Sequence, residues 1–122
     1  MIRIVQNAEK RMKIIEIVES LNLKVCSGAQ GLENEVDGGY ASDLLSDVMG
    51  NAQTGNIWVT LQTHKNIMAV ASLKDLSAVV LVKGLTPDAD TAAQSNEEGI
   101  PVLSTELDAF TVIGKLFNLL SD

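Results

Sequence analysis

The apolar run AVVLV at residues 78–82 constrains the fold of this chain more than any other stretch. Successive side chains of a strand point to opposite faces of its sheet, so a strand without polar residues has to be covered on both faces. Strand patterns also occur at residues 56–62 and 101–103, and a helical pattern follows each of these strands. Strands that alternate with helices favour a parallel arrangement, because right-handed crossovers place the helices on the faces of the sheet. The sequence therefore predicts a single α/β domain with a mostly parallel sheet flanked by helices.

Polar residues that precede the helical patterns are expected to cap the helices. Thr63 precedes a predicted helix at residues 65–74, and Thr86 precedes the next helix. The last helix is expected to begin after Ser104 or Thr105. Its apolar positions are Phe110, Ile113, Phe117 and Leu120.

The N-terminal part of the chain has shorter patterns. Apolar residues at helical spacing predict an amphipathic helix at residues 10–21, and a short strand is expected at residues 23–26. Residues 1–11 are expected to form a frayed extension, which leaves residues 12–122 as the domain.

The segment before the second strand pattern combines an irregular extended stretch with a short helix. The extended stretch covers residues 36–41, and Ser42 or Asp43 is expected to cap the helix that follows. Trp58 lies within a predicted strand and is expected in the core. Cys26 is the only cysteine, which excludes an internal disulfide, and it is interpreted as a small buried apolar residue.

Composition excludes several classes of function. The formal net charge is −7 and aromatic residues make up 3% of the chain, whereas nucleic-acid binding needs clustered cations and stacking platforms. No apolar run is long enough for a membrane span or a secretory signal. We therefore expect a cytoplasmic protein that binds neither nucleic acid nor membranes.

The loops that follow parallel strands meet at the carboxyl edge of the sheet, where α/β proteins usually bind ligands. Helix N-termini at this edge present free N–H groups to a small anion, although the same residues can serve only as helix caps. The pair Gly38-Gly39 is expected to make a tight turn beside this edge and to direct Tyr40 across the domain. The candidate ligand-edge residues are Gly38, Gly39, Tyr40, Thr63, His64, Lys83, Gly84, Ser104 and Thr105.

Three other motifs do not identify a reaction or a binding site. The loop GNAQTGNI at residues 50–57 has the glycine spacing of a phosphate-binding P-loop but lacks its lysine and its serine or threonine. His64 is the only histidine, so it has no partner for a multi-histidine zinc site. Asp43 and Asp47, four residues apart, can either face one divalent cation or stay solvated. No catalytic residue, cofactor site or metal site is assigned.

The order of four segments resembles the DRTGG domain family, over most of the chain from about Met12 to the C-terminus. These segments are VDGGYASDLLSDVM, IWVTLQTH, AVVLVKG and GIPVLST. The sequence departs from the two motifs that give the family its name: His64-Lys65 stands near the DR pair, and Val82-Lys83-Gly84 stands near the TGG triplet. Family members occur as small stand-alone proteins, inside some phosphate acetyltransferases, and between CBS domains of some inorganic pyrophosphatases.

This resemblance implies a fold similar to the N-terminal domain of HPr kinase/phosphatase, which lacks the kinase P-loop. It also implies a regulatory or interaction module, often dimeric, rather than a catalyst. We therefore expect a non-catalytic homodimer that acts on an unidentified protein partner and senses a small anionic or nucleotide-like ligand. The alternative is a metabolite-binding protein or a small enzyme that uses His64, Lys83 and Ser104 around a phosphorylated compound.

Overall fold

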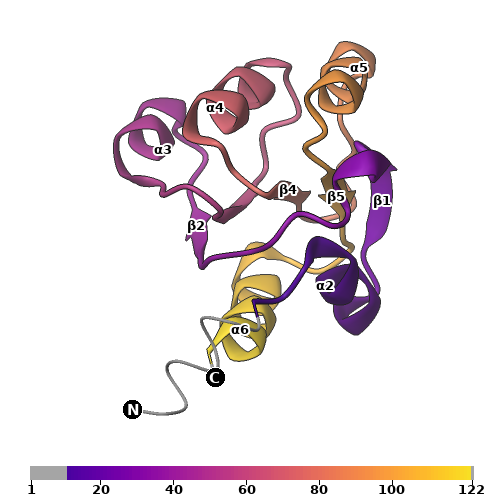
Figure 1. Cartoon of the computed structure of the whole chain (residues 1–122), viewed down its shortest axis with the longest axis vertical. Helices are drawn as coiled ribbons and strands as arrows, with labels where there is room; N and C mark the ends of the chain where they lie inside the picture. Colours follow the sequence, from indigo (N-terminus) through magenta and orange to yellow (C-terminus); the bar gives the residue numbers. More distant parts are fainter. Residues whose placement is uncertain (1–10, 122) are drawn as a thin grey trace.

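The computed structural model describes residues 11–121, which form three layers with a sheet between two groups of helices (Figure 1). The predicted extension therefore lies outside the described residues, except for Arg11. The elements in chain order are α2 (Ile14–Leu21), β1 (Lys24–Ser27), the 3-10 turn η1 (Ala29–Gly31), β2 (Gly39–Ala41), α3 (Leu45–Asn51), β3 (Ile57–Thr60), α4 (Asn66–Lys74), β4 (Ala78–Leu81), α5 (Ala89–Glu98), β5 (Val102–Ser104) and α6 (Ala109–Leu120).

The sheet has five strands in the order β1-β5-β4-β3-β2. Strands β2, β3, β4 and β5 run parallel to one another, and β1 pairs antiparallel with β5 at one edge. The apolar strand β4 lies at the centre, with both neighbours hydrogen-bonded to it. The predicted α/β class with a mostly parallel sheet is confirmed.

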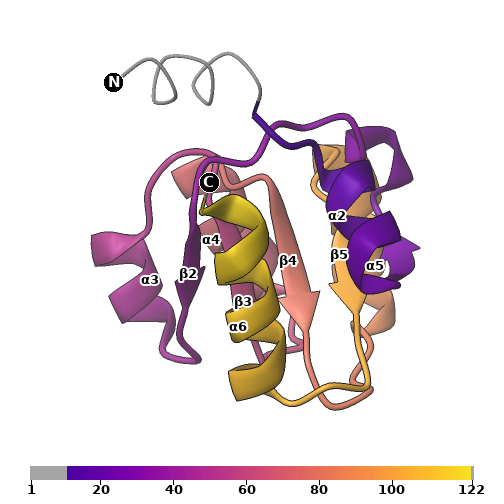
Figure 2. The ribbon, with the colours of Figure 1, turned by 90° about the horizontal axis from the view of Figure 1, so that it is seen from below.

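Each face of the sheet has its own apolar core. Helices α3, α4 and α5 cover one face, and α2 and α6 cover the other (Figures 1 and 2). Trp58 and Val79 point to the first face, whereas Ile57, Val59 and Val80 point to the second. Trp58 is fully buried, as predicted, because β3 is covered on both faces.

The helices begin later than the polar residues that were expected to cap them. The N-cap residues of α4 and α5 are Lys65 and Asp88, and neither makes a side-chain cap bond. Asp108 caps α6, where its carboxylate accepts a hydrogen bond from the Thr111 N–H at 2.8 Å. The predicted caps Thr63, Thr86, Ser104 and Thr105 are therefore wrong, because each strand is followed by a longer loop than the sequence pattern indicated.

The structure shows which apolar residues of α6 are buried, and it corrects the burial predicted for Cys26. On α6 the buried residues are Val112 and Leu116, whereas Phe110 and Phe117 of the predicted apolar positions are 89% and 70% exposed. Cys26 is half-buried rather than buried, and this partial burial raises the pKa of its thiol while Lys24 lowers it.

Within the described residues, every helix is too short or too polar to cross a membrane.

Candidate functional site

The loops at the carboxyl edge of the sheet are joined by main-chain hydrogen bonds. The Thr63 carbonyl accepts a hydrogen bond from the Asp88 N–H at 3.1 Å, which ties the loop after β3 to the start of α5. The Gly84 N–H donates to the Thr105 carbonyl at 2.8 Å, which ties the loop after β4 to the loop after β5. The structure therefore places six of the candidate residues at one edge: Thr63, His64, Lys83, Gly84, Ser104 and Thr105.

Lys83 and Gly84 form a tight turn that directs the lysine away from the sheet. Both residues have positive φ, 59° and 74°, and the Leu85 N–H donates to the Val82 carbonyl at 3.1 Å. This combination is a type I′ turn, which favours glycine because a side chain is strained at positive φ. The Lys83 side chain is left exposed at the carboxyl edge.

The side chains at this edge differ in what they can offer a ligand. His64 is exposed, and its Nδ1 accepts a hydrogen bond from the Asn66 N–H at 3.2 Å. Ser104 is buried, and its hydroxyl donates to the Leu85 carbonyl at 2.6 Å. The arrangement of His64, Lys83 and Ser104 as an enzyme site is not favoured, because the Ser104 hydroxyl is engaged inside the protein.

Gly38, Gly39 and Tyr40 do not join the other candidates. Gly39 begins β2 and pairs with Ile57, the first residue of β3, so both glycines lie at the amino edge of the sheet. Gly38 has a φ of +76°, which explains the need for glycine there. The Tyr40 hydroxyl turns toward α3 and donates to the Asp47 carboxylate at 2.9 Å. The structure has no turn or bend at residues 36–39, so the expected tight turn is wrong, and the glycine pair lies at the edge opposite to His64 and Lys83.

The prediction that Ser42 or Asp43 caps α3 is wrong, because the N-cap residue is Leu44, and Asp43 instead organises the carboxyl end of β3. Its Oδ1 accepts hydrogen bonds from the Thr60 hydroxyl at 2.8 Å and from the Leu61 N–H at 2.7 Å. In the sequence, this role is indicated by an acidic residue just after the end of one parallel strand, β2, because the end of the neighbouring parallel strand, β3, lies next to it. Asp43 and Asp47 bind different partners, and the described residues contain no group of three or more potential metal ligands.

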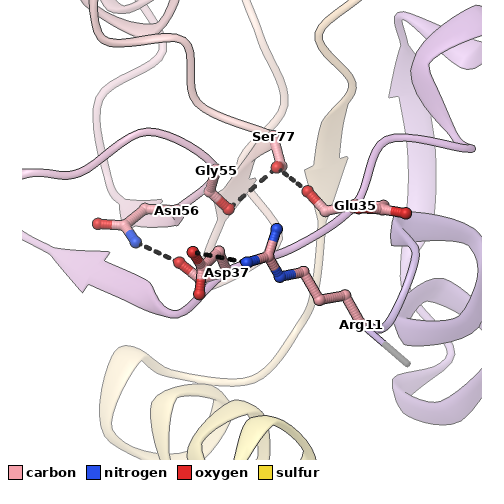
Figure 3. A network of polar contacts seen from close by, with 6 residues as sticks. All are labelled: Arg11, Glu35, Asp37, Gly55, Asn56 and Ser77. Carbon is pink, nitrogen blue, oxygen red and sulfur yellow. Dashed lines mark hydrogen bonds and ion pairs between the residues drawn. The ribbon is translucent and has the colours of Figure 1, made fainter. Parts of the chain in front are cut away.

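A polar hollow of about 520 Å³ lies at the amino edge of the sheet. Figure 3 shows its wall: the Ser77 hydroxyl donates to the Gly55 carbonyl at 3.0 Å and contacts the Glu35 carbonyl, and the Arg11 guanidinium lies 3.9 Å from the Asp37 carboxylate. These contacts fasten three connecting segments below the strands. They give this wall of the hollow a structural role.

An apolar groove of about 290 Å³ lies between α6 and β2. Its floor is formed by Ile57 and Val59, and its walls include Gly39 on β2 and Ile113 and Phe117 on α6. The sequence signal for this groove is the set of apolar positions of the last helix, which includes Ile113 and Phe117.

The Tyr40–Asp47 hydrogen bond provides a test of the β2–α3 packing. This bond lowers the pKa of Asp47 below 3.8 and, with partial burial, raises the pKa of Tyr40 above 10.0. Asp47 therefore stabilises the fold above its ordinary pKa and loses this effect as the pH falls through the lowered value. Tyr40 stabilises it below its ordinary pKa and loses this effect as the pH rises through the raised value.

We expect Tyr40→Phe to lower the thermal midpoint at neutral pH, and the difference from wild type to shrink in strong acid. Circular dichroism melts across this pH range measure the difference. Because Tyr40 is the only tyrosine, phenolate absorbance reports its titration directly. In Asp47→Asn this titration should move to lower pH, and an unchanged curve would show that the hydrogen bond is absent in solution.

Comparisons with known proteins agree with this fold. The structure is similar to the CBS and DRTGG domains of the regulatory region of Clostridium perfringens pyrophosphatase, complexed with its activator, diadenosine tetraphosphate. The TM-score is 0.66 at 15% sequence identity, and the match covers 84% of this chain and 44% of that chain. No curated protein matches the sequence.

A family model, that of the DRTGG domain, matches residues 16–119. This range includes every element from β1 to β5 and most of α2 and α6. This chain therefore belongs to the DRTGG domain family.

Proposed function

We propose that this chain is a non-catalytic regulatory module that works in the cytoplasm as a homodimer. It binds a small anionic, nucleotide-like ligand at the carboxyl edge of its sheet and acts on a protein partner. The Clostridium perfringens regulatory region of similar fold is complexed with a dinucleotide activator, which supports a phosphate-bearing ligand. Within this chain, the support comes from the helix start described next.

The ligand proposal depends on one observation, the uncapped start of α5. Asp88 is its N-cap and makes no side-chain cap bond, so the N–H groups of the first turn keep their capacity to bind an anion. His64 follows Thr63, whose carbonyl is bonded to the Asp88 N–H, and Lys83 lies on the loop that leads into α5. An anion placed there meets the positive end of the helix dipole, and His64 and Lys83 are exposed on the loops after β3 and β4 at the same edge of the sheet.

A thermal-shift titration with inorganic phosphate, AMP, ADP and ATP tests this proposal. A ligand that binds only the folded chain stabilises it by about 2.7 kcal/mol at one hundred times its dissociation constant. We expect Lys83→Ala and His64→Ala to weaken the shift. Lys74→Ala is the matched control, because it removes the same charge at the end of α4, at the amino edge. Asp90→Asn removes an acid from the first turn of α5 and should strengthen binding.

Two results would contradict the ligand proposal. One is the absence of stabilisation by all four anions in the wild type. The other is an equal loss in Lys74→Ala and Lys83→Ala, which would indicate a general charge effect rather than a site.

Exposed apolar surface supports the homodimer. Helices α2 and α6 cover the same face of the sheet. Ile14 and Ile17 of α2 are fully buried, whereas the large exposed apolar side chains of these two helices belong to α6. Large exposed aromatic side chains are typical of interaction surfaces. Sedimentation equilibrium over a range of concentrations should therefore give a dimer, and a monomer at every concentration would contradict this part of the proposal.

A further inference from the structure

Helix α6 has two apolar stripes, and only one of them packs on the sheet. Val112 and Leu116 form the inner stripe and are 0% and 4% exposed. The outer stripe contains Phe110, Ile113 and Phe117, which are 89%, 37% and 70% exposed. Two phenylalanines exposed to this extent on one helix leave a large apolar area in water.

The outer stripe lies beside the groove over β2. This strand is at the edge of the sheet and lies beside α6 in Figure 2, with the groove between the strand and the helix. The groove continues into a second hollow of about 200 Å³ at the carboxyl end of β2 and β3. The two hollows share Ala41, Val59 and Ile113 as lining residues, so a depression runs along the length of the strand.

The charge distribution indicates what covers this surface. The chain has 16 acidic residues and a net charge of −7, yet residues 109–120 contain no acid and one cation, Lys115. Two copies of an acidic chain repel each other over most of their surface. Helices α4 and α6 both lack acidic residues, and α6 has the larger exposed apolar area, so it is the better place for two copies to meet without this repulsion. A basic partner would find no carboxylate on the helix to pair with. A second copy of the chain is therefore the occupant that the charges favour.

The shape of the surface also suits a two-fold interface, in which one patch has to be complementary to itself. The patch contains a protruding side chain, Phe110, and a groove that Phe117 helps to line. Phe110, Ile113, Phe117 and Leu120 follow the alternating spacing of three and four residues that packs one helix along another. A Cβ added at Gly114 would meet no atom within 4 Å, so a second helix can approach closely there.

We propose that two copies dimerise through α6, antiparallel across a two-fold axis near Gly114, so that Phe110 of each copy enters the α6–β2 groove of the other. Phe110 then lies near the partner's Phe117, and the free face of β2 is covered by the second copy. This inference rests on the proposed homodimer and names its interface. The groove is complete only in the dimer, because its outer wall comes from the second copy.

Sedimentation equilibrium of Phe117→Asp tests the interface. We expect the dimer dissociation constant to rise about 100-fold or more, because the substitution places a carboxylate in an apolar contact. Leu73→Asp is the matched control: Leu73 is 73% exposed on α4, on the opposite face of the sheet, and its replacement should leave the dimer intact. Circular dichroism verifies that both variants are folded.

Cross-linking gives a second, positional readout. In a Cys26→Ser background, Gly114→Cys should form a covalent dimer on mild oxidation, since the two-fold axis brings the two cysteines together. Leu73→Cys in the same background should not. A wild-type dimer that is unaffected by Phe117→Asp and does not cross-link at position 114 would overturn this interface while leaving the homodimer in place. A wild-type monomer would overturn both.

Discussion

Trp58→Ala is expected to lower the free energy of unfolding by about 3–5 kcal/mol, which is the usual cost of removing a fully buried aromatic side chain. The indole ring is 0% exposed and belongs to the core between the sheet and helices α3 and α4. Its Nε1–H also donates a hydrogen bond to the Ser42 carbonyl at 2.8 Å. The substitution therefore creates a cavity and leaves a carbonyl without its donor.

This hydrogen bond connects the core to the carboxyl edge. Ser42 directly precedes Asp43, whose carboxylate holds the end of β3 through Thr60 and Leu61. Loss of the indole should therefore loosen the loop after β2 as well as destabilise the domain. Amide hydrogen exchange at Leu61 is expected to accelerate more than exchange at the centre of β4.

The variant Trp58→Phe separates packing from hydrogen bonding. Phenylalanine keeps most of the apolar contact but cannot donate to Ser42, so we expect a loss of about 1–3 kcal/mol from the unpaired carbonyl and the smaller ring. Urea denaturation followed by circular dichroism measures both variants, since Trp58 is the only tryptophan and fluorescence is lost with it. A loss below 1 kcal/mol in Trp58→Ala would contradict the buried position of the ring.

The fold class could be predicted because its evidence is local. A strand such as β4, with four buried apolar residues in succession, fits only a sheet covered on both faces. Helix starts were harder to predict, because the loop after each parallel strand has no sequence signal for its length. Thr63 and Thr105 resemble caps by position, but their carbonyls accept hydrogen bonds from neighbouring loops that are distant in the sequence.

The edge of the sheet at which the candidate residues lie could be predicted for some of them, again where the evidence is local. Positions that follow β3 and β4 lie at the carboxyl edge by topology alone, and His64 and Lys83 were placed there correctly. The Gly38-Gly39 pair precedes its strand, and only the start of β2 at Gly39 shows that it belongs to the other edge. On α6, both apolar stripes have helical spacing, so the choice between Leu116 and Phe117 as the inner residue depends on tertiary packing.

Gly31→Ala is expected to lower the free energy of unfolding by about 3 kcal/mol, at the upper end of the range for overpacked sites. A Cβ at Gly31 would clash with the Gly99 carbonyl oxygen and would lie 2.7 Å from Cδ of Pro101. The first contact is with main chain, which cannot move away as a flexible side chain can. Relief requires η1 to separate from the loop between α5 and β5, and this loop positions the strand that pairs with β1.

Gly50→Ala is the matched control for this prediction. Gly50 lies within α3, and a Cβ there would meet no atom within 4 Å. Alanine is favoured over glycine inside a helix, so this variant should gain about 0.5–1 kcal/mol instead of losing stability. Chemical denaturation of both variants under the same conditions measures the free energy of unfolding. It compares one substitution, glycine to alanine, at a crowded position and at an open one. If Gly31→Ala were as stable as Gly50→Ala, η1 would have to lie farther from Gly99 in solution. The contact between η1 and the α5–β5 loop would then not be what holds the antiparallel strand β1 in place.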